Sequence, residues 1–400
     1  RALPDSGVTL EAVAGADTVR VPWRLALALL DSVPGIVELR DAPGSSGDGI
    51  TIGRAQPDAT YHWFWPSGTR AVTSGLLGDF RRLRLAPGLD AWVPASETAE
   101  VPGGAPVPVV GSLTFSPSAD RVSLRIPLSD RVPFEIVERE RELEITLFGA
   151  AGDVNWIRYG HDDPIVERVA WTQAPEGVRI TVALSEPVWG FRNRWDRGDL
   201  LVEIRRPPAL ARGNPLEGLV VAVDPGHPPA GASGPTGLTE AEANLGVALL
   251  LRDMLADAGA EVILTRTTDT PVDLGARPRL AEERGAHLLV SIHNNALPDG
   301  VNPFPNNGTS VFYNHPRSIP LARAVQRALV AELGLRDLGI GRGDLALVRP
   351  TWMPAILTEG LFMMVPEQEA ALRSEEGRRR YARGVFEGIR AWLRERARAD

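Results

Sequence analysis

Four side chains that lie far apart in the sequence have the types and the placement for metal-assisted hydrolysis: His227, Glu240, His293 and Glu359. Three of them, all except Glu240, follow short apolar runs that are typical of strands. The carboxyl ends of parallel strands meet at one edge of a sheet, where such folds bind ligands. Glu240 opens the helix expected after the first strand, so it starts near the same edge. We therefore expect all four side chains to converge.

This set of residue types predicts a zinc site. Two histidines and one carboxylate, here His227, Glu240 and His293, are a common zinc ligand set that leaves a fourth position open for water. Zinc lowers the pKa of that water to about 7 and polarises a carbonyl oxygen. A second carboxylate, Glu359, can accept the water's proton and pass it to a leaving amine. The prediction is amide hydrolysis with one zinc ion in the catalytic domain.

Each of these residues taken alone has a simpler interpretation. Glu240 has the place of an acidic first-turn residue, which the helix dipole favours. His293 can form a hydrogen bond in a turn, and Glu359 can be one partner of a buried ion pair. Only their shared placement at one sheet edge favours the joint interpretation.

Residues 218–400 alternate apolar strands with helices, which predicts an α/β domain with a mostly parallel sheet flanked by helices. Thr239 and Glu242 have the spacing of a capping box, and Gly259 suits the end of the same helix. The expected helices span 239–258, 273–285, 318–333 and 376–396. The expected strands span 219–223, 261–264, 287–292, 309–313, 345–348 and 355–358.

The first 206 residues predict two all-β domains. Residues 1–100 place aromatic and alternating runs between glycine and proline turns, as small β barrels do, with a short helix expected at 24–30. Residues 111–206 alternate with a period of two, which predicts a β-sandwich whose strands have one buried face. Its clearest strands are 121–126, 142–147, 178–184 and 200–204. The stretches 101–110 and 207–217 have the composition of linkers.

Each β segment contains a group of aromatic residues. Trp63, Phe64 and Trp65 form the first group, and Trp189, Phe191 and Trp195, near the end of the second segment, form the other. Either group has the chemistry to bind sugar, but burial in a core is the favoured interpretation.

The composition of the 400-residue chain excludes several classes of function. Cysteine is absent, which rules out disulfides, thiolate metal sites and cysteine nucleophiles. The net charge of −8 argues against a nucleic-acid partner. No apolar run reaches the roughly 20 residues of a membrane span. Because the chain begins with Arg1, we expect a processed product from which a signal peptide has been removed.

Residues 218–397 resemble the zinc-dependent N-acetylmuramoyl-L-alanine amidases of the amidase-3 type. The resemblance rests on five stretches in a fixed order: 224–227 (DPGH), 237–245 (GLTEAEANL), 264–266 (LTR), 290–295 (VSIHNN) and 354–359 (PAILTE). The β-sandwich segment resembles the AMIN-type domains that precede some cell-wall amidases. Residues 88–95 resemble the closing strand of a bacterial SH3-like domain.

The resemblance implies roles for individual residues. His227, Glu240 and His293 would be the zinc ligands, and Glu359 the catalytic carboxylate. The scissile bond would join the lactyl group of N-acetylmuramic acid to L-alanine of the peptidoglycan stem peptide. Such an enzyme works outside the cytoplasm, in the periplasm or the cell wall, and the two β domains would attach it to the wall or envelope.

Two further residues near the same edge are expected to contact substrate. Asn294 directly follows His293, and Arg349 has the geometry to bind a stem-peptide carboxylate in a bidentate manner. Ordinary loop composition explains the first equally well, and a structural ion pair explains the second.

This chain departs from the family pattern at several places. Pro228 and Pro229 stand where glycines are usual, which predicts a stiffer rim of the site. The apolar run 361–365 replaces a more polar stretch and either shapes specificity or belongs to the core. The segment 294–308 is too short for the helical insert that plugs the zinc site in some members, so we predict no autoinhibition of that kind.

Two other functions remain open. One is a catalytically inert wall-binding protein with a degenerate amidase domain, although the complete set of four residues argues against it. The other is a zinc peptidase that cuts a different peptidoglycan bond, which the digestion products would distinguish.

Overall fold

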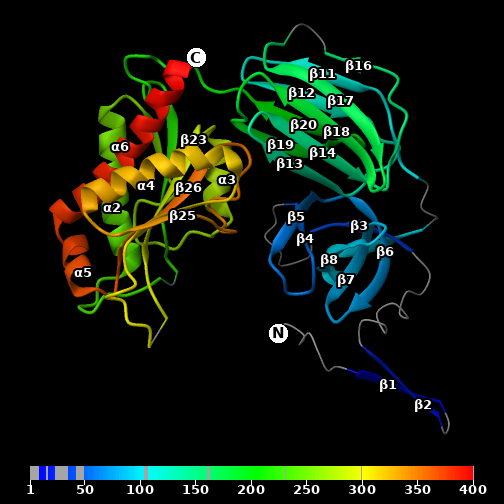
Figure 1. Cartoon of the computed structure of the whole chain (residues 1–400), viewed down its shortest axis with the longest axis horizontal. Helices are drawn as coiled ribbons and strands as arrows, with labels where there is room; N and C mark the ends of the chain where they lie inside the picture. Colours follow the sequence, from blue (N-terminus) through cyan, green and yellow to red (C-terminus); the bar gives the residue numbers. More distant parts are fainter. Residues whose placement is uncertain are drawn as a thin grey trace. The chain divides into compact units, whose positions relative to one another are not determined.

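The computed structural model describes residues 9–14, 17–22, 35–41, 49–102, 107–159, 163–229, 231–298 and 300–399. The helix expected at 24–30 lies outside these residues. The chain divides into two compact units, one all-β and one α/β (Figure 1). The first comprises Arg1–Glu186 and Asn193–Ile204, and the second comprises Pro187–Arg192 and Arg205–Asp400.

The first half of the all-β unit forms one antiparallel seven-stranded sheet, preceded by the hairpin of β1 (Thr9–Ala14) and β2 (Asp17–Pro22). The sheet order is β5-β4-β8-β7-β6-β3-β9. Trp63 and Trp65 on β5 are buried whereas Phe64 between them is 39% exposed, so core packing is confirmed for the two tryptophans. The strands are β3 (Gly35–Leu39), β4 (Ile50–Arg54), β5 (Tyr61–Pro66), β6 (Arg70–Leu77), β7 (Phe80–Ala86), β8 (Leu89–Pro94) and β9 (Thr98–Val101), with the 3-10 turn η1 (Ala95–Glu97).

The second half of this unit has a five-stranded sheet, β16-β11-β12-β20-β19, and a four-stranded sheet, β13-β14-β18-β17, with a short pair of β10 and β15. Every second residue of β12 is buried (Val122, Leu124 and Ile126), as a strand with one wet face requires. The strands are β10 (Val109–Val110), β11 (Leu113–Pro117), β12 (Arg121–Ile126), β13 (Phe134–Arg139), β14 (Glu142–Phe148), β15 (Ala151–Gly152), β16 (Ile157–Arg158), β17 (Val166–Ala174), β18 (Gly177–Leu184), β19 (Gly190–Asp196) and β20 (Asp199–Arg205).

The α/β unit is built on a six-stranded sheet in the order β22-β21-β23-β26-β24-β25. Neighbouring strands run parallel except that β24 is antiparallel to β26. The strands are β21 (Val220–Pro225), β22 (Glu261–Leu264), β23 (Leu288–Asn295), β24 (Thr309–Tyr313), β25 (Asp337–Arg342) and β26 (Ala355–Phe362).

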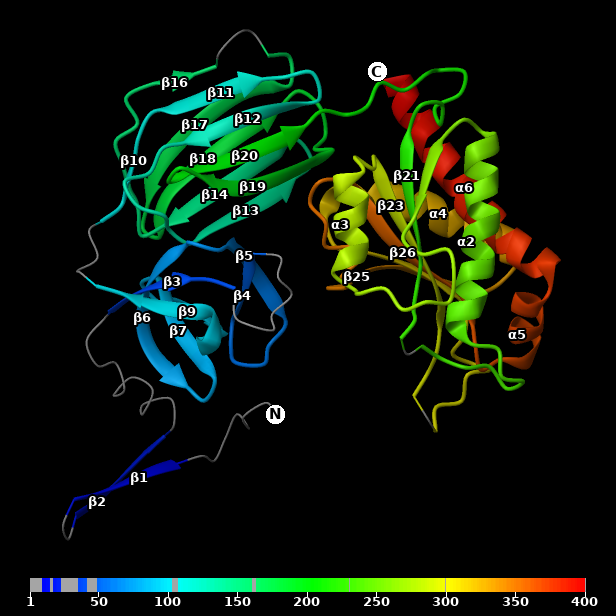
Figure 2. The same ribbon diagram turned by 180° about the vertical axis from the view of Figure 1, so that it is seen from behind.

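Helices cover both faces of this sheet because its central strands are apolar on both sides. Val221 and Val223 of β21 share a core with α2, α4 and α6, whereas Ala222 between them faces a second core with α3 (Figure 2). The helices are α2 (Glu240–Asp257), α3 (Ala276–Glu283), α4 (Ile319–Leu333), α5 (Pro366–Arg373) and α6 (Glu375–Ala399), with the 3-10 turn η2 (Pro316–Ser318). Among the residues that the structure describes, no helix has both the length and the apolar character needed to cross a membrane.

The structure corrects two predictions about individual elements and adds one helix that the sequence does not predict. Residues 345–348 do not form a strand but lie in a turn, and the sixth strand is β25 instead. The sequence does not predict α5, a short helix that begins at Pro366. Finally, β23 and β26 continue past His293 and Glu359, so both residues lie within strands rather than directly after them.

Candidate active site

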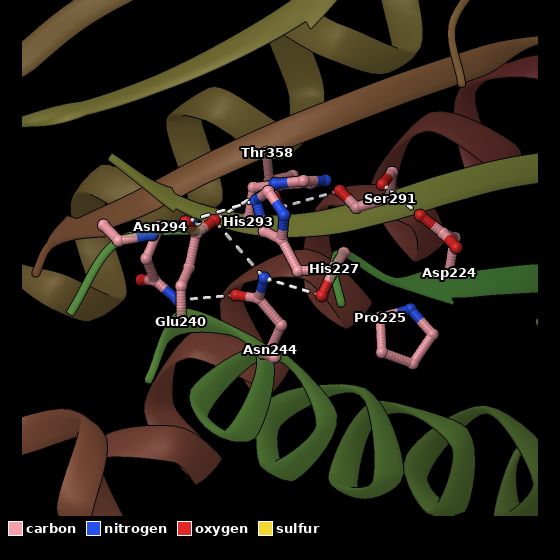
Figure 3. A network of polar contacts seen from close by, with 12 residues as sticks. Asp224, Pro225, His227, Glu240, Asn244, Ser291, His293, Asn294 and Thr358 are labelled. Carbon is pink, nitrogen blue, oxygen red and sulfur yellow. Dashed lines mark hydrogen bonds and ion pairs between the residues drawn. The ribbon is translucent and has the colours of Figure 1, made fainter. Parts of the chain in front are cut away.

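His227, Glu240 and His293 come together at one point of the α/β unit (Figure 3). One nitrogen or oxygen from each lies within 4.8 Å of the others, which is the spacing of groups that can share a metal ion. His227 Nε2 is 3.2 Å from Glu240 Oε2, and His293 Nδ1 is 3.1 Å from Glu240 Oε1. The carboxylate therefore lies between the two imidazole rings.

The turn after β21 places His227. The backbone of this histidine is left-handed, with φ of 59°, and the N–H of Gly226 donates to the carbonyl of Ile292 on the neighbouring strand. Gly226 has no room for a side chain, because a Cβ there would lie 2.2 Å from His293 Nε2. The absence of a side chain at Gly226 thus lets the two histidine rings approach each other, with centroids 4.9 Å apart.

The first turn of α2 places Glu240. The helix begins as the sequence predicts, since the N–H of Glu242 donates to Thr239 Oγ1 at 3.2 Å. The buried carboxylate of Glu240 also accepts hydrogen bonds from the N–H groups of Ala232 and Asn294, at 3.0 and 3.2 Å. Burial alone raises the pKa of Glu240, but the hydrogen bonds with His227 and His293 outweigh it and bring the pKa below its usual value.

Glu359 lies beside this cluster on β26. It is the register partner of His293 on β23 and of Ser310 on β24. Its Oε2 is buried, and among the described residues it has no hydrogen-bond partner. Burial, followed by the charge of Glu240, raises the pKa of Glu359 to about 8. A buried carboxyl oxygen without a partner costs free energy unless a ligand or reactant uses it.

Tyr381 on α6 packs against the two strands that carry His293 and Glu359. The sequence does not predict this role. Its fully buried hydroxyl donates to the carbonyl of His293 at 2.7 Å and lies 2.8 Å from Thr358 Oγ1. The ring packs so closely against Gly360, next to Glu359, that a Cβ there would be 2.3 Å from it. In the sequence, Tyr381 has the appearance of any apolar residue on the inner face of a helix.

Glu369 on α5 holds the loop that leads into Glu240. This carboxylate accepts hydrogen bonds from the N–H groups of Thr236 and Leu238 and from the hydroxyl of Thr236, at 2.9 to 3.1 Å. Because α5 was not predicted, this contact could not be predicted either.

The two expected substrate contacts have partners inside the domain. Asn294 is buried; its amide donates to Asn244 Oδ1 at 2.9 Å and its Oδ1 accepts from the N–H of Leu361 at 3.1 Å. Arg349 forms an ion pair with Asp344 at 2.5 Å, which agrees with the structural alternative. Their contact with substrate stays a prediction.

Two of the departures from the family pattern also have a place in the structure. The run 361–365 belongs largely to the core, since Leu361, Phe362 and Met363 are at most 4% exposed. The described residues between Asn295 and Thr309 form turns and bends rather than a helix.

A mainly parallel sheet that carries a His–Glu–His cluster beside a carboxyl oxygen to which none of the described residues forms a hydrogen bond is the arrangement expected of a metal-dependent hydrolase. Residues 221–391 match the family model of N-acetylmuramoyl-L-alanine amidase. The chain belongs to this amidase family.

The amidase part of the chain is similar in sequence to several known proteins. The N-acetylmuramoyl-L-alanine amidase LytC of Bacillus subtilis is 32% identical over 187 residues, which are 45% of this chain and 37% of LytC. The uncharacterised protein YqiI of the same organism is 32% identical over 188 residues, 46% of this chain and 88% of YqiI. The crystal structure of an N-acetylmuramoyl-L-alanine amidase from Clostridium difficile 630 has 32% identity and a TM-score of 0.42, and the match covers 44% of this chain and 97% of that one. The chain thus spans little more than a third of LytC but most of YqiI.

Proposed function

We propose that this protein is a zinc-dependent N-acetylmuramoyl-L-alanine amidase that acts on peptidoglycan. The reaction is hydrolysis of the amide bond between the lactyl group of N-acetylmuramic acid and L-alanine of the stem peptide. The observation that carries the proposal is the buried Oε2 of Glu359, which has no hydrogen-bond partner in the described part of the chain, beside the cluster of His227, Glu240 and His293. Membership of the amidase family supports the choice of substrate.

The three clustered side chains fit zinc as ligands. Two imidazoles and a carboxylate are donors that zinc prefers, and the lowered pKa of Glu240 keeps it ionised. His227 Nδ1 lies 3.4 Å from the carbonyl of Pro229, a contact that leaves Nε2 to face the cluster. When bound here, zinc would supply an activated water and polarise the scissile carbonyl.

Glu359 would move the proton. Its carboxylate accepts a proton from water as the water oxygen bonds to the amide carbon, and then donates it to the leaving nitrogen as the C–N bond breaks. A pKa raised by burial suits a group that must return the proton it takes. The products are a carboxylic acid on the sugar and a stem peptide with a free amino group on L-alanine.

The β domains in the rest of the chain would attach the enzyme to the wall or envelope. We assign residues 1–100 to a β domain of SH3-like character, 111–206 to an AMIN-like β-sandwich and 218–400 to the catalytic domain, joined by the segments 101–110 and 207–217. The working place would be outside the cytoplasm, in the periplasm or the cell wall. We still predict that no helix plugs the zinc site and inhibits the free enzyme. This prediction fails if the purified chain is active only with an added activator.

Digestion of purified sacculi tests the function. The wild-type chain should bind zinc and release stem peptides that begin with free L-alanine, as identified by mass spectrometry. The Glu359→Ala chain should keep its zinc and release no such peptides. Peptides cut at another bond would favour a zinc peptidase. Zinc binding without any released product would favour an inert wall-binding protein.

A further inference from the structure

The turn that carries His227 needs hydrogen-bond donors from elsewhere. Pro225, Pro228 and Pro229 have no N–H, and the N–H of Gly226 is already used by Ile292. The carbonyls of residues 225–228 nevertheless face the interior, where unpaired backbone groups are costly.

Two buried arginines supply those donors. Arg266, whose side chain is 1% exposed, donates to the carbonyls of Pro225 and Gly226 at 2.8 and 2.9 Å. Arg277, whose side chain is 3% exposed, donates to the carbonyl of Pro225 at 3.0 Å, of His227 at 3.1 Å and of Pro228 at 2.8 Å. Together the two guanidinium groups satisfy every carbonyl from residue 225 to residue 228.

Each arginine is itself fixed to another part of the site. Arg266 donates at 2.7 Å to the carbonyl of Ala241, the residue after Glu240. Arg277 forms an ion pair at 3.1 Å with the fully buried Asp224, which also accepts from the hydroxyls of Thr265 and Ser291 at 2.5 and 2.6 Å. Arg266 therefore joins the turn of His227 to the helix start of Glu240, and Arg277 joins the same turn to β21.

We propose that Arg266 and Arg277 are positioning residues that hold the His227 turn in the geometry needed to bind metal. The inference rests on the proposed function, since it assumes that His227, Glu240 and His293 are the ligands. It also explains how a turn with prolines at 228 and 229 keeps its shape without their N–H groups.

The planar fork of arginine is essential to this role. A guanidinium has five donors in a fixed plane and can reach several carbonyls at once, whereas the single ammonium of lysine cannot. Groups that orient metal ligands in this way change metal affinity by about 10- to 100-fold when they are replaced. We therefore expect Arg277→Lys and Arg266→Lys to weaken zinc binding by such a factor, although both keep the positive charge.

The test is a zinc affinity measurement on the full chain by competition with a chromophoric chelator, with the absorption spectrum of bound Co²⁺ as a second readout. Arg205→Lys is the matched control. Arg205 is buried and donates to the carbonyls of Gly285 and Ala286, just before β23, at the opposite end of that strand from His293. The Arg205→Lys variant should lower the unfolding temperature, as the other two variants do, but keep the zinc affinity and the Co²⁺ spectrum of the wild type.

The outcomes separate this inference from the proposed function. A wild-type chain that does not bind zinc would overturn the function itself. A wild-type chain that binds zinc, with Arg277→Lys and Arg266→Lys within twofold of it, would overturn only the role of the arginines. Equal weakening in Arg205→Lys would also overturn it, because the effect would then follow stability alone. Should Arg277→Lys fail to fold, Arg266→Lys decides by the same criterion, since it leaves the pair of Arg277 and Asp224 in place.

Discussion

At the scale of single residues, the site depends on a side chain that is absent as much as on those that are present. Gly226 lies against the imidazole of His293, which Glu240 holds in place from its other side. The ring can therefore admit a methyl group at position 226 only by giving up its contact with Glu240. This links the glycine of the sequence motif to His293 rather than to its own neighbour, His227.

Gly226→Ala should displace the His293 ring and weaken zinc binding. The new Cβ would lie 2.2 Å from Nε2, so the ring or the turn must shift, and we expect a loss of at least about tenfold in affinity. Chelator competition measures it. Gly213→Ala is the control, since no atom of the residues that the structure describes lies within 4 Å of a Cβ there. Unchanged affinity in Gly226→Ala would show that the turn accommodates a side chain.

Tyr381→Phe should destabilise the fold around His293. The hydroxyl of Tyr381 donates to the His293 carbonyl in a fully buried position, and its removal leaves that carbonyl without this partner. We expect a loss of about 1–3 kcal/mol in the free energy of unfolding, measured with urea. Tyr313→Phe is the control, because the hydroxyl of Tyr313 takes part in none of the described hydrogen bonds and should stay within about 0.5 kcal/mol of the wild type. Equal losses in both variants would contradict the assigned role.

At the scale of elements, the sequence was informative wherever the signal is local. The apolar run of β21 and the Thr239 cap of α2 depend on neighbours in the chain, and both were readable. By contrast, β25 is largely exposed and contains two glycines, so it has no alternation to detect. Arg277 in α3 has the appearance of a surface arginine, because the five residues that accept its six hydrogen bonds are known only once the domain has folded.

A pH effect on stability should arise where β21 and β23 begin. His287 directly precedes β23, and its Nδ1 accepts the N–H of Val220, the first residue of β21, at 2.9 Å. Burial, and then the charge of Arg205, lowers the pKa of His287 to about 4. The unfolded chain, with a histidine pKa of about 6.5, binds the proton first. The contribution of His287 is therefore complete above pH 6.5 and declines as the pH falls towards 4.

His287→Asn tests this effect. The Asn side-chain oxygen can still accept the Val220 N–H, but it does not titrate. The stability of the wild type should therefore fall relative to that of the variant between pH 7 and pH 4.5 in urea unfolding. Both chains share every other titrating group, so the difference isolates His287. Parallel profiles would contradict the prediction.

At the scale of the whole molecule, the α/β unit includes six residues that precede the predicted linker 207–217. Residues 187–192 follow β18 and include the first three residues of β19, yet they belong to the α/β unit. Trp189 is 1% exposed in its core, stacks on Trp392 of α6 at 5.5 Å and donates to the carbonyl of His287 at 3.1 Å. A six-residue segment of this kind has no signature in composition, so the sequence does not predict that it belongs to the α/β unit.

Trp189→Ala should therefore weaken the α/β unit, although the residue comes from within a β segment. Removal of a fully buried tryptophan leaves a cavity beside Trp392 and costs about 3–5 kcal/mol. Hydrogen exchange on the full chain should show faster exchange in α6 and β23. Trp65→Ala is the matched control, because Trp65 is 0% exposed in the seven-stranded sheet. It should speed exchange in β3 to β9 and leave α6 protected. If Trp189→Ala leaves α6 and β23 as protected as in the wild type, residues 187–192 do not form part of the catalytic core.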